Sequence, residues 1–206
     1  MNNFFKRILS SIILLPLVLF FLLSGSLYLN FFTIICFLVA TYEWHKITKQ
    51  KNIKILGLIF LIFSFYTFNV IGNGYFWPMV LLICISTDIG GYIFGKIFGG
   101  PKLTKISPNK TYAGTIGGYL LSLISLSYYL SLTNIVITIE FLITTILLST
   151  VSQVGDIIIS HFKRLSKVKD TGRIIPGHGG LLDRIDGMIF AFPLFYLIEI
   201  TGYLLK

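Results

Sequence analysis

The chain has 206 residues, of which 55% are hydrophobic and only 12% charged, and its mean hydropathy is +0.85. This balance excludes an ordinary soluble globular domain and indicates a protein that has a lipid bilayer as its solvent. The formal net charge of +9 is expected on loops that face anionic lipid, so no nucleic-acid partner is predicted.

Apolar runs close to the roughly 20 residues of a membrane-spanning helix follow one another along the chain. The first follows Lys6 and Arg7 and ends near Leu23, and it is predicted to be an uncleaved span because it lacks a small-x-small cleavage site. The later runs cover residues 27–42, 55–72, 75–95, 114–132, 135–160 and 187–205. The sequence predicts an all-α, polytopic transmembrane helical bundle of about seven spans.

Only residues 24–26, a Ser-Gly-Ser turn cluster, separate the first two runs, so one long kinked segment is the alternative there. With the N-terminus cytoplasmic, every Lys and Arg except Lys206 lies on the cytoplasmic side, in residues 6–7, 45–54, 96–110 and 161–184. The opposite hairpin tips, residues 72–74 and 131–134, carry no charge. This distribution follows the positive-inside rule and supports the seven-span orientation.

Two cysteines, Cys36 and Cys84, both fall inside apolar runs. A buried thiol in a helix is ordinarily inert packing, so neither a disulfide framework nor a zinc site is predicted.

The first long basic loop runs from Asp88, through a glycine-rich stretch, to Gly114. Ser107 is predicted as the N-cap of the next helix with Pro108 in its first turn, where Lys110 and Thr111 would add a cation and a hydroxyl to exposed backbone N–H groups. A helix start of this kind would be suited to binding phosphate. The alternative is a basic loop that touches lipid headgroups, and the residues alone leave both open.

The second loop contains charges of both signs together with a Gly-His-Gly-Gly run at residues 177–180. Acids, bases and glycines together indicate a metal–nucleotide site, because a triphosphate is handled as its magnesium complex and Mg²⁺ prefers carboxylate oxygens. Asp183 and Asp186 are three apart and would share one helix face. The carboxylates come from Asp156, Asp183 and Asp186, and the phosphate-neutralising cations from Lys163, Arg164, Lys169, Arg173 and Arg184.

Each of these residues also has a plainer interpretation. Asp183 and Asp186 could cap the last helix, Lys163 and Arg164 could be a positive-inside signal, and His178 could be a turn residue. Asp156 is harder to explain in this way, because an ionised group in mid-membrane costs about 2.5 to 3.5 kcal/mol and needs a partner.

The segment at residues 160–186 resembles the phosphatidate cytidylyltransferase signature throughout. The resemblance extends to residues 152–156, 88–95 and 107–111 and to the pair Glu43-Trp44, so it covers nearly the whole chain. Ala113 departs from the pattern, because relatives commonly have Glu or Gln there. The chain is also shorter than the usual relatives, which carry more spans around the position of residues 45–75.

The resemblance implies an enzyme, a nucleotidyltransferase that transfers the cytidylyl group of CTP to phosphatidate, giving CDP-diacylglycerol and pyrophosphate. It implies one integral membrane domain over residues 1–206, with N-terminal helices in 1–75 and catalytic helices and loops in 76–206. The expected setting is the cell inner membrane, with the active site facing the cytoplasm and membrane lipids around the spans. A homodimer is left open.

The resemblance also implies roles for individual residues. The expected cofactor is Mg²⁺ with a second cation, such as K⁺. The expected catalytic residues are Lys163, Arg164, Lys169, Asp170, His178 and Arg184; the substrate-binding residues are Asp88, Ser107, Lys110, Thr111, Ser152, Gln153, Gly179 and Gly180; the metal ligands are Asp156, Asp183 and Asp186.

Four other functions compete with this interpretation. A CTP-dependent polyprenol or alcohol kinase would place acids at the same interface, and a CDP-alcohol transferase is disfavoured because its Asp-Gly-x-x-Ala-Arg pattern is absent. An ion or proton transporter would use Asp88 and Asp156 as relay sites but needs no basic glycine-rich loop. An inactive relative is compatible with the short N-terminal half and Ala113.

Overall fold

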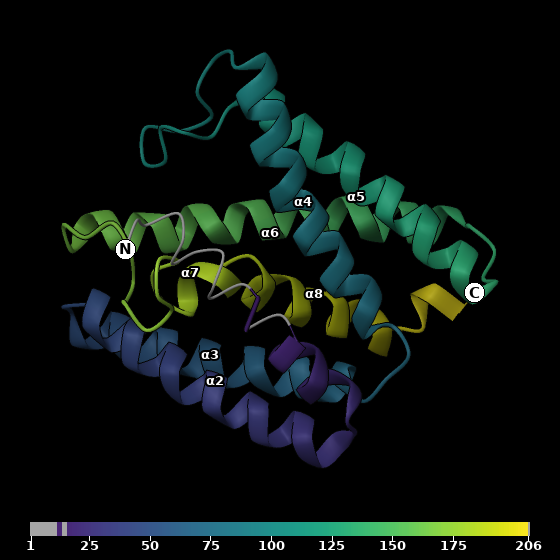
Figure 1. Ribbon diagram of the computed structural model, residues 1–206, viewed down its shortest axis with the longest axis horizontal. Coiled ribbons are helices and arrows are strands. Elements are labelled where there is room, and N and C mark those ends of the chain that lie inside the picture. Colours follow the sequence, from purple (N-terminus) through teal and green to yellow (C-terminus); the bar gives the residue numbers. More distant parts are fainter. Residues whose placement is uncertain (1–11, 14–15, 206) are drawn as a thin grey trace. The chain divides into compact units, whose positions relative to one another are not determined.

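The computed structural model describes residues 12–13 and 16–205 (Figure 1). The chain divides into two compact units: unit 1 comprises Met1–Tyr75 and Phe162–Asp186, and unit 2 comprises Phe76–His161 and Gly187–Lys206. The basic glycine-containing loop therefore packs with the N-terminal helices, far from it in sequence, rather than with the helices that immediately flank it.

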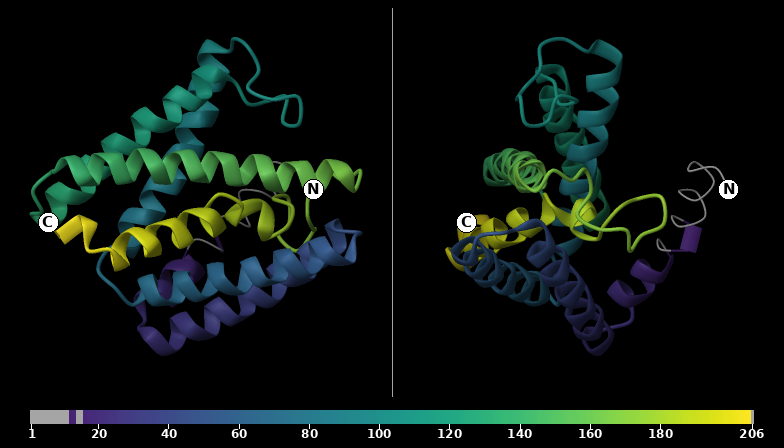
Figure 2. Two further views of the ribbon diagram at one scale, coloured as in Figure 1. Left: turned by 180° about the vertical axis from the view of Figure 1, so that it is seen from behind. Right: turned by 90° about the vertical axis from the view of Figure 1, so that its left-hand side faces the viewer.

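Unit 1 is built on a helical hairpin, α2 (Ser26–Ile47) and α3 (Lys51–Gly72), which lie side by side in Figures 1 and 2. The hairpin closes around Trp44, whose indole N–H donates to the backbone oxygen of Lys54 at 3.3 Å. A Cβ on Gly57 would lie 2.1 Å from the Trp44 ring. The glycine in α3 therefore allows the close approach of the two helices.

Unit 2 contains α4 (Trp77–Phe98), α5 (Tyr112–Thr133), α8 (Met188–Ile200) and the 3-10 turn η1 (Tyr203–Leu205). It also contains α6 (Ile139–Leu165) up to His161, the last turn of this helix belonging to unit 1. Glycines hold α4 against α5, because a Cβ on Gly90 would lie 2.2 Å from the carbonyl oxygen of Gly117. Close backbone approach through small residues is typical of helices that pack inside a membrane.

Side-chain hydrogen bonds also join the helices of unit 2. Thr87 on α4 donates to Ser149 on α6 at 2.9 Å, and Tyr119 on α5 pairs with Thr150 on α6 at 2.9 Å. Such bonds satisfy polar groups where no water is present to do so.

The described residues contain five helices long and apolar enough to span a membrane, α2 to α6, which correspond to five of the predicted spans. The all-α, multi-pass prediction is confirmed, whereas seven spans are not. Residues 12–13 and 16–23 of the first predicted span are helical, and the rest of that span lies outside the described residues.

The last predicted span, residues 187–205, is shorter in the structure. Its helix α8 ends at Ile200 after 13 residues, about 20 Å, which is less than the roughly 30 Å of a bilayer core. The apolar run continues beyond Ile200, but a turn at residues 201–202 separates α8 from η1.

Candidate functional site

The last turn of α6 carries Lys163 into unit 1, where its ammonium lies 2.8 Å from Oδ1 of Asp183. Both side chains are largely buried, with exposed fractions of 10% and 5%. Asp183 lies in the short helix α7 (Leu182–Ile185). Two buried opposite charges neutralise each other here, and either alone would be costly.

The other oxygen of Asp183, Oδ2, holds the loop that precedes α7. It accepts the backbone N–H of Thr171 at 2.8 Å, the Thr171 hydroxyl at 3.1 Å and the backbone N–H of Gly180 at 3.0 Å. The carboxylate of Asp183 therefore joins α6 to both ends of the loop. These contacts fix the orientation of the Asp183 side chain.

The Gly-His-Gly-Gly run forms a tight turn. The N–H groups of His178 and Gly179 both donate to the carbonyl oxygen of Ile175, and the His178 carbonyl accepts from Arg184 at 2.9 Å. Gly177 and Gly179 have φ of 79° and 92°, a left-handed conformation that favours glycine. His178 thus lies in a turn, as the plainer interpretation had it, while a phosphate contact by its ring stays a prediction.

Gly180 lies where there is no room for a side chain. A Cβ there would lie 2.1 Å from Oγ1 of Thr171 and 2.4 Å from Oε2 of Glu43. The predicted nucleotide contact of this glycine is untested, but its small size already serves the packing of the loop.

Glu43, part of the Glu43-Trp44 pair, is a site residue to which the sequence pattern gave no role. Glu43 lies on α2, is 0% exposed, and accepts hydrogen bonds from Thr171, Leu181 and Leu182. An acid at the end of an apolar run was the available signal, because such a group needs partners.

Unit 2 contains a second lysine–aspartate pair. Lys110, in the loop before α5, lies 2.6 Å from Oδ2 of Asp156 on α6, with exposed fractions of 23% and 29%. Lys110 also donates to the backbone oxygen of Gln153 at 3.3 Å, and Ser160 donates to Oδ1 of Asp156 at 3.2 Å. The predicted phosphate-binding lysine and the predicted metal-binding aspartate are thus brought together.

The predicted start of α5 was wrong. The N-cap is Thr111, not Ser107: α5 begins at Tyr112, and the Thr111 hydroxyl accepts the N–H of Gly114 at 3.1 Å. Residues 101–110 form turns and bends, with the Ser107 N–H bound to the Thr104 hydroxyl. Ser107 and Pro108 are typical of a helix start, but in the structure they form a turn that does not continue into a helix.

The remaining predicted site residues divide by exposure. In unit 1 the exposed ones are Arg164, Lys169, Asp170, Arg173 and Arg184, whereas Asp186 is buried. In unit 2 Asp88 on α4 is exposed, and Ser152 on α6 is 1% exposed and packed against Gly187. Unit 1 therefore presents mostly cations to solvent around a buried acidic network, an arrangement suited to binding an anion.

The carboxylates have the donor chemistry that magnesium prefers. Oδ1 of Asp183 accepts one hydrogen bond, as do both oxygens of Asp156, which leaves each of these oxygens a lone pair for a further ligand. Within neither unit, for the residues described, do three or more His, Cys, Asp or Glu side chains gather as a metal cluster. Because Asp156 belongs to unit 2 and the other two aspartates to unit 1, the three-aspartate site stays a prediction.

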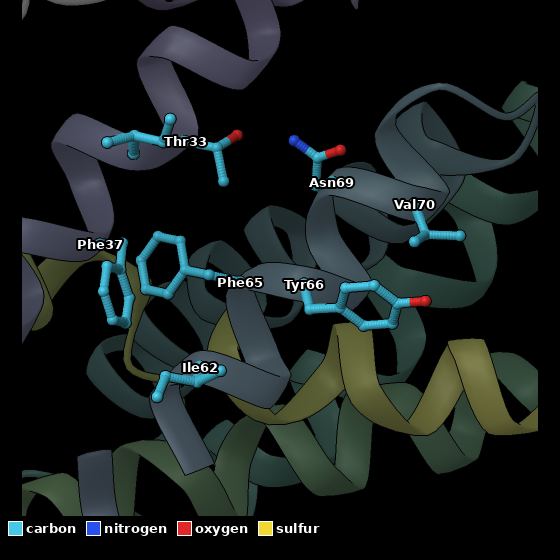
Figure 3. Close-up of a pocket in the computed structure, with 8 residues that line it drawn as sticks. Thr33, Phe37, Ile62, Phe65, Tyr66, Asn69 and Val70 are labelled. Atoms are coloured by element: carbon cyan, nitrogen blue, oxygen red, sulfur yellow. The ribbon is translucent and has the colours of Figure 1, made fainter. Parts of the chain in front are cut away.

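A groove between α2 and α3 of unit 1 lies away from these residues. Figure 3 shows its lining, in which the rings of Phe37 and Phe65 meet edge to face with centroids 5.6 Å apart. Thr33 and Asn69 are among its few polar residues, and among the residues that the structure describes no acid, lysine or arginine lines it. The groove suits apolar contacts and lacks the groups that phosphoryl chemistry needs.

Comparison with known proteins identifies the family of the chain. A family model described as "Cytidylyltransferase family" matches residues 5–79 and 58–201. A protein of Rickettsia bellii named phosphatidate cytidylyltransferase is 37% identical over 96% of this chain and 91% of its own length, and one of Rickettsia conorii with the same name is 35% identical over 97% and 92%. A Staphylococcus haemolyticus protein of that name is 42% identical over 72% of this chain but only 57% of its own length.

Proposed function

The chain belongs to the cytidylyltransferase family, and we propose that it transfers the cytidylyl group of CTP to phosphatidate, giving CDP-diacylglycerol and pyrophosphate. The observation that carries the proposal is the similarity, over nearly the full length of both chains, to relatives named phosphatidate cytidylyltransferase. The chain covers more than nine-tenths of the length of both relatives.

In the proposed reaction an oxygen of the phosphatidate phosphate attacks the α-phosphorus of CTP. A new P–O bond forms, the bond from the α-phosphorus to the bridging oxygen breaks, and pyrophosphate leaves with the electron pair. The nucleophile is already anionic, so the protein needs little base catalysis and must instead bring two anions together and neutralise their charge.

Cations of unit 1 are suited to that task. Arg164, Lys169 and Arg184 are exposed and would bind phosphate oxygens, including those of the leaving pyrophosphate. Lys163 is buried and paired with Asp183. Its ammonium group would therefore act on the substrate from a fixed position, held by this ion pair. Asp170 and His178 lie in the same basic loop and are the further proposed catalytic residues.

In unit 2, Lys110 and Thr111 would bind phosphate from the start of α5, with Asp88, Ser107, Ser152 and Gln153 as further substrate contacts. Asp156, Asp183 and Asp186 would hold Mg²⁺, with K⁺ as the proposed second cation. A bound magnesium ion would offset negative charge on the phosphates. Lys110 currently neutralises Asp156, and a shift of its ammonium to a substrate phosphate would leave that carboxylate available.

The chain is a multi-pass membrane protein, and we propose an inner-membrane location with the N-terminus and the active site cytoplasmic. In unit 1 the α2–α3 connection and the basic loop meet at one end, since the Ser166 hydroxyl donates to the carbonyl oxygen of Ile47. Phosphatidate would enter laterally, because removing acyl chains from the bilayer costs ~0.8 kcal/mol per CH₂. Labelling of Asn73→Cys and Lys105→Cys variants, each in a Cys36→Ser/Cys84→Ser background, with an impermeant maleimide tests the sidedness: only the second should be shielded in intact cells.

The activity is tested with purified protein, phosphatidate, Mg²⁺ and CTP labelled in the cytosine ring. Label in the chloroform-soluble fraction with matched pyrophosphate release is the expected result. Omission of phosphatidate should abolish both signals. Pyrophosphate without lipid label, or no turnover by folded protein that binds CTP, would contradict the proposed function.

A further inference from the structure

We propose that Glu43 is the positioning residue of the active site: its buried carboxylate anchors both ends of the loop at residues 171–182 and thereby sets the orientation of Asp183. This inference rests on the proposed function for its catalytic consequence but on the contacts of unit 1 for its geometry. Glu43 lies one turn before the end of α2 and is 0% exposed.

Both oxygens of the Glu43 carboxylate accept hydrogen bonds from the loop. Oε2 accepts the Thr171 hydroxyl at 2.7 Å and the Leu182 N–H at 2.8 Å, and Oε1 accepts the Leu181 N–H at 3.0 Å. The last two donors open helix α7, which has no side-chain cap of its own. Glu43 therefore supplies from α2 the acceptor that a helix start requires.

Thr171 links this anchor to Asp183. Its hydroxyl oxygen lies 2.7 Å from Oε2 of Glu43 and 3.1 Å from Oδ2 of Asp183, and its backbone N–H donates to the same Oδ2. The hydroxyl has one proton, which it can donate to only one of these two oxygens at a time. With Oδ2 held in this way, Oδ1 of Asp183 faces Lys163.

The loop sequence is adapted to this anchor. A Cβ on Gly172 would lie 2.4 Å from Oε1 of Glu43, and one on Gly180 would lie 2.4 Å from Oε2. Both glycines allow the backbone to close on the carboxylate. The two ends of the loop thus meet at one side chain from a helix that is distant in sequence. Outer residues that orient a metal-ligand residue are arranged in this way.

The test uses Glu43→Gln, which keeps the volume but offers one acceptor oxygen and turns an NH₂ toward loop donors. Hydrogen–deuterium exchange of the detergent-solubilised chain should show amides of residues 171–182 exchanging at least about tenfold faster, with the middle of α3 unchanged. Lipid labelling should fall about 10- to 100-fold, with a higher half-saturating Mg²⁺ concentration. Glu140→Gln, an equal charge change in the first turn of α6, should alter neither readout.

Thr171 provides a second pair of variants should Glu43→Gln fail to fold. Thr171→Val removes the bridging hydroxyl and should reproduce the exchange and activity losses, whereas Thr171→Ser keeps the hydroxyl and should restore both. Loop exchange within about twofold of wild type in Glu43→Gln or Thr171→Val would overturn the anchor. A wild-type protein without lipid label would overturn the proposed function instead, and the exchange result would still decide the anchor.

Discussion

The two lysine–aspartate pairs of the described residues differ in how completely the protein surrounds them. The side chain of Asp183 is 5% exposed and faces four hydrogen-bond donors, which are Lys163, the N–H and the hydroxyl of Thr171, and the N–H of Gly180. Asp156 is 29% exposed and accepts two, from Lys110 and Ser160.

This difference in burial indicates that the charge of Asp183 is needed for the fold, whereas the charge of Asp156 can change its partner. Asp183 is buried and cannot lose a hydrogen-bond partner without leaving another group unsatisfied, so it is part of the fold as well as the site. A partly solvated pair can exchange its lysine for a ligand at little cost, because surface ion pairs contribute about 0–1 kcal/mol. Unit 1 thus offers a preorganised site, and unit 2 an adjustable one.

The largest effect is expected for Asp183→Asn. The amide removes the charge that balances buried Lys163 and turns an NH₂ toward one set of donors, so unfolding should become easier by about 3–5 kcal/mol. Thermal unfolding in detergent measures the loss, and lipid labelling should vanish. A wild-type melting temperature with full activity would show that the buried network is dispensable.

A smaller loss is expected for Gly180→Ala, because the new Cβ would overlap Thr171 and Glu43. Overpacking of this kind costs about 1–3 kcal/mol. The control is Gly91→Ala in α4, whose Cβ would have no neighbour closer than 3.8 Å. Equal melting temperatures for the two variants would refute the close contact.

For the pair in unit 2 the expectation is reversed: activity falls more than stability. Asp156→Asn and Lys110→Met should each change unfolding by at most about 1 kcal/mol, while lipid labelling drops by about tenfold or more. Parallel melting and labelling curves decide this. A stability loss as large as that of Asp183→Asn would remove the distinction between the two pairs.

The smallest effect concerns the start of α5. Thr111→Val removes the hydroxyl that accepts the Gly114 N–H and should cost about 1 kcal/mol, whereas Ser107→Ala should change stability by less than about 0.5 kcal/mol. Only thermal unfolding is compared, since both residues are proposed to contact substrate. The opposite order would restore Ser107 as the cap.

Sequence reasoning failed where two local signals competed. Ser107-Pro108 and Thr111 are both acceptable helix starts, and the choice depends on how residues 101–110 turn back, with the Leu103 N–H bound to the Lys110 carbonyl. The apolar run after residue 187 likewise predicts a span by composition, but composition does not reveal the turn at residues 201–202 that ends α8 early.

By itself the sequence determined the membrane class, five of the spans and the family, because apolar run length and a long motif are properties of neighbouring residues. Only the tertiary structure decided which acids meet which donors. Glu43 binds groups that lie 128 to 139 positions later in the chain. Pairing over such a separation depends on how helices pack and on the need to satisfy every buried polar group, which no local pattern contains.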